Sequence, residues 1–205
     1  RGLGDVYKRQ IIMIWNRISY RKFQFSRNGG ICMRDLLIVV DMQNDFITGA
    51  LKAENATAIL PNVKEEIGKR SSEDVIFTMD THNENYLDTS EGRHLPIRHC
   101  IKGSNGWKLE PSIEKMVRDS LIIEKPTFAS LMLIDTLRKR IASKEDTITL
   151  VGLCSDICVI ANAVLIKTYF RENPVRVIKD AVKGVTEESN REALNVMKAL
   201  QIDLI

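Results

Sequence analysis

The stretch TITLVGLCSDICVIANAV, residues 147–164, decides the fold of this 205-residue chain. It begins as a run of β-branched and aliphatic residues, breaks at Gly152 and continues as an apolar segment of helical length. This pattern predicts a buried strand that turns sharply into a helix, with Ser155 and Asp156 as candidate helix caps. In an open α/β sheet, such a turn lies at the carboxyl ends of the strands, where ligands bind.

Cys158 stands in the first turn of this predicted helix. The unpaired N–H groups and the positive end of the helix dipole favour a thiolate at such a position. We therefore expect Cys158 to be a nucleophile, with core packing as the alternative role of a cysteine on an apolar helix face. A cysteine nucleophile needs a base, an orienting charge and hydrogen-bond donors for the developing oxyanion, and the rest of the chain must supply them.

The rest of the chain alternates between continuous apolar runs and segments of helical periodicity. Continuous apolar runs are typical of strands that are buried on both faces of a parallel sheet. The predicted strands are residues 36–40, 75–79, 120–125, 147–151, 175–180 and a short one over 202–205. The predicted helices are residues 56–69, 131–143, 158–171 and 187–200. This alternation predicts an α/β fold of three layers (α/β/α), with a doubly wound, mainly parallel sheet of about six strands.

Charged residues follow three of these strands at the point where each strand ends. Asp41, Asp80 and Lys125 are these residues, and parallel strands bring such ends to one edge of the sheet. We expect them to converge on Cys158, with Asp41 as the base and Lys125 holding the Asp41–Cys158 pair electrostatically. The backbone N–H groups of Cys154 and Cys158 are the expected oxyanion donors. The alternatives are that the aspartate caps a turn and that the lysine is an ordinary surface residue.

The polar segment from residue 81 to 111 is too long to be an idle connection. Asp80 and His82 lie two residues apart at its start, so in extended chain both side chains face the same side. His94 and His99 follow in the same segment, and these three are all the histidines of the protein. One carboxylate with two imidazoles suits a single divalent ion such as Zn, Fe or Mn. An Asp-x-His pair is also common in ordinary turns.

Composition bounds the remaining possibilities. The chain is 44% hydrophobic and 28% charged, as expected for one α/β domain, which we place at residues 33–205. Residues 1–32 carry a net charge of +6, and we expect them to be a disordered or non-native extension; a basic helix that packs on a partner is the alternative. Residues 33–205 carry a net charge of −3 without a basic cluster, which argues against nucleic acid as a partner.

No apolar run has the length of a membrane span, and four cysteines do not make a disulfide framework in a chain of this size. We therefore expect a cytoplasmic protein without a membrane partner.

Five short motifs, taken together, resemble the isochorismatase-like cysteine hydrolase family, and within it the nicotinamidase/pyrazinamidase group. They occur in the family's order, and the resemblance covers residues 35–205. The motifs are DMQNDF (41–46), DTH (80–82), HCIKGSNGW (99–107), EKPTFAS (124–130) and VGLCSDICV (151–159).

The resemblance implies a catalytic triad of Asp41, Lys125 and Cys158. Cys158 would attack an amide carbonyl, release ammonia and leave a thioester for water to cleave. In this group the substrate is nicotinamide and the product, nicotinate, feeds NAD salvage. The related alternatives are a hydrolase for another small amide, such as an N-carbamoyl compound, and a catalytically silent member of the fold.

The resemblance also implies metal ligands at Asp80, His82 and His99, which favours His99 over His94 as the third ligand. The ion and its waters would hold the pyridine nitrogen of nicotinamide. A homo-oligomer, dimeric or tetrameric, is expected from the same resemblance.

Three further features of the substrate site follow from the family. Its non-proline cis peptide, which opens the oxyanion hole, falls on Leu153–Cys154, and the aromatic residue of its substrate pocket falls on Phe46. Pro96 occupies a position at which nicotinamidases often carry a tryptophan, which leaves the exact amide open.

Overall fold

The computed structural model describes residues 33–205. The prediction that residues 1–32 form a disordered or non-native extension concerns a segment that lies outside the described residues. Among the described helices, none is both long enough and apolar enough to cross a membrane.

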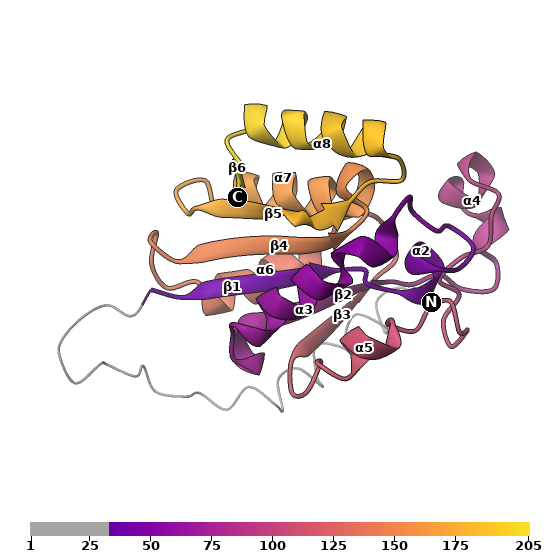
Figure 1. Cartoon of the computed structure of the whole chain (residues 1–205), viewed down its shortest axis with the longest axis horizontal. Coiled ribbons are helices and arrows are strands. Elements are labelled where there is room, and N and C mark those ends of the chain that lie inside the picture. The colour runs from indigo at the N-terminus through magenta and orange to yellow at the C-terminus, as the bar shows by residue number, and fades with distance from the viewer. Residues whose placement is uncertain (1–32) are drawn as a thin grey trace, which may run out of the picture. The chain divides into compact units, whose positions relative to one another are not determined.

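Strands and helices alternate along the described chain (Figure 1). The strands are β1 (Asp35–Val40), β2 (Val75–Asp80), β3 (Leu121–Lys125), β4 (Thr147–Leu153), β5 (Val175–Lys183) and β6 (Asp203–Leu204). The α-helices are α2 (Asn44–Ile47), α3 (Leu60–Gly68), α4 (Ser90–His94), α5 (Pro111–Glu114), α6 (Leu131–Arg140), α7 (Ile160–Tyr169) and α8 (Glu187–Ala199). Short 3₁₀ helices are η1 (Ala56–Ile59), η2 (Ser72–Asp74) and η3 (Tyr86–Asp88), and η4 (Ser155–Val159) is a π-helix.

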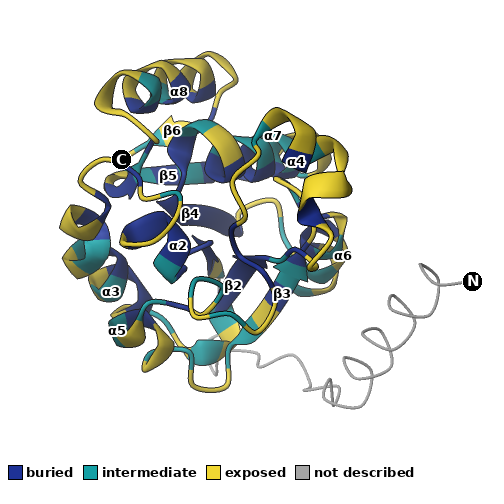
Figure 2. Cartoon of the chain, turned by 90° about the vertical axis from the view of Figure 1, so that its right-hand side faces the viewer, coloured by how far each residue is buried: buried dark blue, intermediate teal, exposed yellow. Residues whose placement is uncertain are grey.

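The six strands form one sheet in the order β3-β2-β1-β4-β5-β6, and every neighbouring pair is parallel. Helices cover both faces, and the central strands β1, β2 and β4 are buried almost throughout (Figure 2). The predicted three-layer α/β/α fold with a doubly wound parallel sheet is therefore confirmed.

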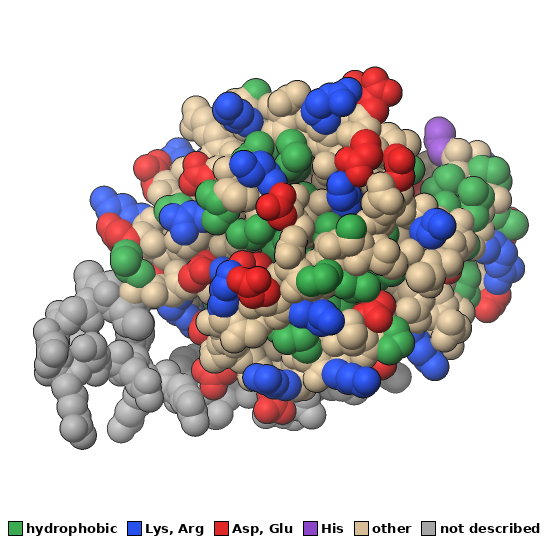
Figure 3. All heavy atoms as spheres, viewed as in Figure 1, with side chains coloured by type: hydrophobic (Ala, Val, Ile, Leu, Met, Phe, Trp, Pro, Cys, Tyr) green, Lys and Arg blue, Asp and Glu red, His purple; other side chains and the backbone are tan. Residues whose placement is uncertain are grey.

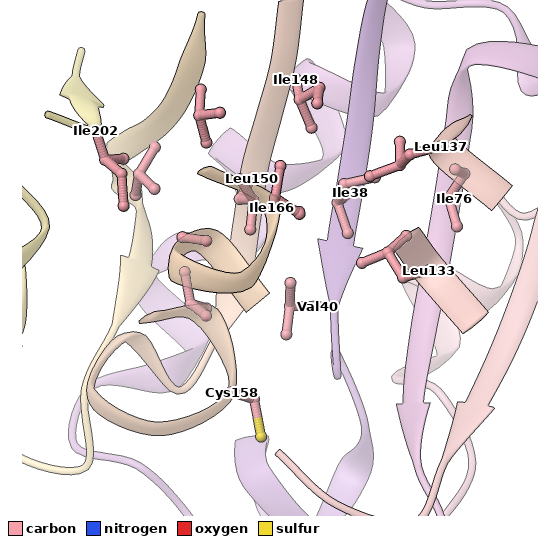
Figure 4. Close-up of a cluster of buried hydrophobic side chains, with 14 of the residues drawn as sticks. Ile38, Val40, Ile76, Leu133, Leu137, Ile148, Leu150, Cys158, Ile166 and Ile202 are labelled. Carbon is pink, nitrogen blue, oxygen red and sulfur yellow. The ribbon is translucent and has the colours of Figure 1, made fainter. Parts of the chain in front are cut away.

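Strand β1 explains the two halves of the core. Its side chains alternate between the faces, so Leu36, Ile38 and Val40 pack with residues of α6, α7 and α8. Leu37 and Val39 point the other way, toward residues of α3 and α5. Cys158 lies beside Val40 at the border of the first cluster (Figure 4). The continuous apolar run of the sequence is thus a strand that has a core on each face.

The carboxyl ends of the strands meet at one edge of the sheet, where β1 and β4 approach closely at Gly152. Gly152 has a φ of 114°, and a Cβ atom there would lie 2.1 Å from the carbonyl oxygen of Val40. Only glycine fits this conformation and this spacing. The close contact places the residue after β1, Asp41, beside the turn that follows β4.

Several boundaries differ from the prediction. Strand β4 continues through Gly152 to Leu153, because Gly152 keeps its pairing with β5. Helices α2, α4 and α5 were not predicted, because segments of four or five residues show no apolar periodicity. The π-helix η4 stands where the α-helix after β4 was expected to begin.

The prediction that Ser155 and Asp156 cap this helix is wrong, because both side chains bond elsewhere. The Ser155 hydroxyl donates to Asn190 Oδ1 on α8 at 2.6 Å, and the Asp156 carboxylate accepts from the backbone N–H of Val185 at 3.2 Å. These bonds attach the first helical turn after β4 to α8 and to the connection that precedes it.

Charges of both signs alternate over the face of the protein that Figure 3 shows, with no extended area of one sign there.

Candidate active site

Asp41 follows the last residue of β1 in a left-handed conformation, with a φ of 47°. Its side chain is completely buried, and its Oδ1 accepts a hydrogen bond of 2.6 Å from the Thr78 hydroxyl on β2. Its Oδ2 lies 2.7 Å from Nζ of Lys125. The carboxylate is therefore held by two neighbouring strands.

Lys125 is the last residue of β3, and its side chain is also buried. Its Nζ donates to Cys158 Sγ at 3.3 Å, in addition to the contact with Asp41, and lies 3.6 Å from Asp80 Oδ1. Burial opposes the charged form, but Asp41 and Cys158 raise the pKa of Lys125 above its ordinary value. The three predicted triad residues thus meet around one ammonium group, which stays charged.

The thiol of Cys158 does not have the low pKa that the helix dipole suggested. Burial raises its pKa well above the ordinary value, the Lys125 ammonium opposes this shift, and the Asp41 carboxylate adds to it. Desolvation is the largest of these influences, and it acts against the thiolate that the position at the helix start favours. Burial likewise raises the pKa of Asp41, although Lys125 lowers it, so this carboxylate is a stronger base than an exposed aspartate.

The turn that carries Cys158 has an unusual backbone. The Leu153–Cys154 peptide is cis, as the family resemblance implied. The π-helix η4 follows directly, with the backbone N–H of Val159 donating to the Cys154 carbonyl at 3.0 Å. The predicted oxyanion donors, the N–H groups of Cys154 and Cys158, therefore belong to the two ends of one tight turn.

A second cluster of titratable groups lies at the same edge. Asp80, His82, Glu91 and His99 each offer a ligand atom, and these atoms lie within 4.8 Å of one another. Nε2 of His82 lies 3.0 Å from Asp80 Oδ2, and Nε2 of His99 lies 3.4 Å from the same oxygen. His94, the other histidine of the predicted loop, is exposed, and its Nδ1 lies 2.8 Å from the carbonyl of Ser90 in the same helix.

Glu91 is the member of this cluster that the sequence did not single out. It lies on α4, whose N-terminus is capped by the Thr89 side chain, and its Oε1 is 3.6 Å from His82 Nε2 and 3.7 Å from His99 Nε2. The only sequence signal is an acidic residue in the loop between the two histidines. Glu84 and Asp88 share that signal, so spacing alone does not identify Glu91.

The donor set fits a divalent cation. The ligand atoms of Asp80 and Glu91 lie within 4.8 Å of each other, and burial together with the charge of Asp80 raises the pKa of Glu91. Nδ1 of His99 lies 2.8 Å from the Ile97 carbonyl, which can only accept, so Nδ1 carries a proton and Nε2 is the ring nitrogen that faces the cluster and could bind an ion once the ring is neutral. Two imidazoles and two carboxylates around one point are typical ligands of Zn, Fe or Mn.

Two residues of the DMQNDF segment fix the backbone of this cluster. The Gln43 side chain accepts from the Asp80 N–H at 2.7 Å and donates to the Asp80 carbonyl at 2.8 Å, as a neighbouring strand would. Asp45 Oδ2 accepts from the N–H of Cys100, next to His99, at 2.7 Å. A Cβ atom at Gly106 would lie 2.1 Å from Asp45, so glycine is needed for this contact.

Aromatic side chains border the histidines. The Phe46 ring meets His99 edge-on at 5.9 Å between centroids, which places the predicted pocket residue beside the cluster. Tyr86 packs against His82 at 4.6 Å and His99 at 4.9 Å. Trp107 is fixed by a hydrogen bond from its Nε1 to the Thr81 hydroxyl, which makes it an anchor for the loop.

The sequence matches a family model described as the isochorismatase domain over residues 35–205. Among characterised proteins, the chain is 24% identical over 186 residues to the nicotinamidase/pyrazinamidase of Mycobacterium tuberculosis. That alignment covers 82% of this chain and 97% of the relative.

Solved structures with the same fold include enzymes of the same description. The pyrazinamidase of Pyrococcus horikoshii in complex with zinc has a TM-score of 0.69 and 29% identity, covering 84% of this chain and 98% of that one. The nicotinamidase/pyrazinamidase of Bacillus subtilis has a TM-score of 0.72 and 27% identity, with coverage of 84% and 99%. The similarity therefore spans nearly the whole of both solved chains, at low identity.

Proposed function

This chain belongs to the isochorismatase family, and from that premise we propose that it is a metal-dependent cysteine amidohydrolase that converts nicotinamide and water to nicotinate and ammonia. One observation carries the proposal: a buried Asp41–Lys125–Cys158 contact shares an edge of the sheet with the four-residue ligand cluster. The nicotinamidase and pyrazinamidase relatives at 27% and 29% identity support the choice of substrate.

The reaction begins with the transfer of the Cys158 proton to Asp41, whose raised pKa makes it a suitable acceptor. Sγ then attacks the amide carbonyl carbon, and the carbonyl oxygen takes up negative charge. The N–H groups of Cys154 and Cys158 donate to that oxygen in the proposed oxyanion hole. Lys125 keeps its positive charge throughout and compensates the charge that moves between Asp41 and Cys158.

Collapse of this intermediate breaks the C–N bond. Asp41 returns its proton to the leaving nitrogen, so ammonia departs and a thioester to Cys158 remains. Water then attacks the thioester with Asp41 again accepting a proton, and the proton passes to Sγ as the C–S bond breaks. The products are the carboxylic acid and the restored thiol.

The ion would be held by Asp80, His82, Glu91 and His99. When bound, it would supply a positive, Lewis-acidic point that holds a ring nitrogen or water of the substrate complex. Phe46, packed against His99, would present an apolar surface to the aromatic ring of the substrate. Among Zn, Fe and Mn, the zinc complex of the Pyrococcus relative supports zinc.

We extend the proposal to the setting of the enzyme. The family resemblance supports a homo-oligomer, dimeric or tetrameric, acting in the cytoplasm on a small amide. The nicotinate that it releases would feed NAD salvage.

Ammonia release tests this function. Protein loaded with Zn²⁺, Fe²⁺ or Mn²⁺ is assayed with nicotinamide, pyrazinamide and an N-carbamoyl amino acid. We expect turnover of the two ring amides, abolished by Cys158→Ala and retained by Cys100→Ala, whose buried side chain packs in the other core cluster and makes no contact with Lys125 that would activate it. Full metal occupancy with ammonia release from the N-carbamoyl compound alone would replace nicotinamide as the substrate. Full occupancy without turnover of any of the three would contradict the proposal.

A further inference from the structure

Asn162 is completely buried in α7, and its amide group uses three hydrogen bonds. Its Nδ2 donates to the Cys158 carbonyl at 2.8 Å and to the Phe128 carbonyl at 3.0 Å. Its Oδ1 accepts from the backbone N–H of Ser130 at 3.1 Å. Both donors and the acceptor of the side chain are therefore engaged.

These partners belong to two separate segments. One is the π-helical turn η4, which carries Cys158. The other is the connection from β3 to α6, in which Phe128 and Ser130 stand three and five residues after Lys125. Ser130 also begins α6, because its Oγ accepts from the Leu133 N–H at 3.2 Å. The Asn162 amide thus joins the segment of the nucleophile to the segment of the lysine.

Packing does not explain an asparagine at this position. The neighbouring buried residues of α7 are Ala163 and Ile166, and both belong to the apolar core. An amide that is buried without partners is strongly unfavourable, and asparagine is a poor residue inside a helix. An apolar side chain would satisfy the core. What the amide adds is the three directed bonds.

We propose that Asn162 is a positioning residue that holds Cys158 and Lys125 in register by tying their two backbone segments together. The inference rests on the proposed role of Cys158 as the nucleophile. Asn162 itself touches neither the thiol nor the ammonium; it acts on the 3.3 Å contact between them through the backbone. Without the tie, the turn and the loop can move independently, and the thiol is held less often against Lys125.

The experiment compares Asn162→Ala with Asn173→Ala. Asn173 is also buried and also donates from Nδ2 to two backbone carbonyls, those of Ser143 at 2.8 Å and Asp146 at 2.9 Å, but at the opposite edge of the sheet. Two quantities are measured on metal-loaded protein well below the midpoint of unfolding. They are kcat and KM for nicotinamide, and the rate constant for alkylation of Cys158 by iodoacetamide across pH, followed by mass spectrometry.

Both variants should unfold at lower temperature, because each leaves buried backbone groups unpaired. Only Asn162→Ala should lower kcat, by about a hundredfold with little change in KM, since misplacement of a reacting group by about 1 Å has that effect. It should also slow Cys158 alkylation by about tenfold. The proposal is overturned if Asn162→Ala and Asn173→Ala have the same kcat and the same alkylation rate.

Asn162→Thr provides a milder variant in case the alanine protein does not fold. A threonine in a helix can donate to the carbonyl four residues back, as Thr168 does to Val164 in α7, so the bond to Cys158 would survive and those to Phe128 and Ser130 would not. We expect an alkylation rate between those of the wild type and Asn162→Ala; a rate equal to the wild type would overturn the proposal. Because alkylation needs no substrate, it tests the positioning role even if nicotinamide is not turned over.

Discussion

Strand β1 begins with one aspartate, Asp35, and is followed directly by another, Asp41, and the two carboxylates have the same kinds of partner in opposite surroundings. At the amino end, Asp35 accepts from the Thr149 hydroxyl at 2.9 Å and pairs with Arg70 at 2.6 Å. Its side chain is 45% exposed. At the carboxyl end, Asp41 also has a threonine donor and a cationic partner, yet its side chain is 0% exposed.

The difference in burial distinguishes an ordinary surface ion pair, Asp35–Arg70, from a buried pair that can take part in catalysis, Asp41–Lys125. An exposed ion pair adds little to stability and costs little to keep. A buried pair loses so much hydration that apolar residues of similar size often stabilise a protein as well or better. The pair Asp41–Lys125 therefore does not have an obvious purpose in stability, whereas it has one in moving a proton. The two ends of β1 consequently serve as matched positions for experiment.

The largest effect is expected from Asp41→Asn compared with Asp35→Asn. Asparagine keeps the size of the side chain but cannot accept the Cys158 proton, so Asp41→Asn should lower kcat/KM by about a thousandfold, within the usual range for loss of a general base. Asp35→Asn should keep kcat/KM within about threefold of the wild type, because asparagine can still accept from the Thr149 hydroxyl and the lost ion pair is partly exposed and lies at the other end of β1 from the thiol. Equal losses in the two variants would remove the functional distinction between the ends of β1. Steady-state kinetics on nicotinamide decide between these outcomes.

Strand β2 offers the same comparison for the ion. Asp80 ends this strand inside the ligand cluster, whereas Asp74 precedes it and pairs with Arg34 at the other edge. Asp80→Asn should weaken metal binding by more than about a hundredfold, since even indirect contacts to a ligand can contribute that much. Asp74→Asn should bind as the wild type does. Competition with a chelating dye measures both affinities, and a wild-type affinity for Asp80→Asn would contradict the assigned ligand.

The pH dependence gives a third, smaller contrast. Burial raises the pKa of Asp41, so this carboxyl becomes protonated at a higher pH than an ordinary aspartate, whose pKa is about 3.9. Because the ionised form is the base, kcat/KM should fall as the pH decreases through that raised value. Asp35→Asn should leave this acid limb in place. An acid limb at or below pH of about 4 would show that Asp41 is not the group that titrates.

The smallest effect is expected at the amino edge itself. Asp35→Asn should lower the free energy of unfolding by about 1 kcal/mol or less, because the Arg70 pair is partly exposed. The difference from the wild type should shrink further in 1 M salt, where exposed charges are screened within about 3 Å. Urea unfolding at low and high salt measures both values. A loss that stayed large in high salt would mean that this edge depends on its charges more than their exposure indicates.

Much of the fold follows from sequence because the strands are buried on both faces. A run such as residues 36–40 has no polar side to place in water, so the position and length of the strand can be predicted from sequence. The ends of those runs then mark the edge at which Asp41, Asp80 and Lys125 gather. The family resemblance indicated which of these residues form the triad and which bind the metal, and spacing alone did not.

The short helices and the fourth residue of the ligand cluster, Glu91, could not be predicted from the sequence, for a physical reason. Helix α2 is held by distant backbone groups, as the bond from the Asn44 N–H to the Lys108 carbonyl at 2.9 Å shows. Helix α4 brings Glu91 beside His82, whereas Glu84 from the same loop pairs with Arg98 in solvent. Tertiary contacts determine which of these acidic residues joins the cluster, and the local sequence pattern contains no information on those contacts.

Asn162 illustrates the same limit inside the core. In sequence it is one polar residue in an apolar helix, which agrees equally with a helix face turned to solvent. Its three bonds exist only after β3 and the turn of Cys158 have come together.

The π-helical turn η4 has a consequence for insertions and deletions in this gene. Each residue of an α-helix turns the chain by about 100°, and a π turn holds one residue more than an α turn. Loss of a single residue between Cys154 and Cys158 would rotate the thiol around the helix axis by the angle of one residue, which is about 100° in an α-helix and somewhat less in a π turn, and would move it away from Lys125. Substitutions in the turn can leave the rotational position of Cys158 about the helix axis unchanged. In an active enzyme, substitutions in this turn should therefore be tolerated far better than insertions or deletions.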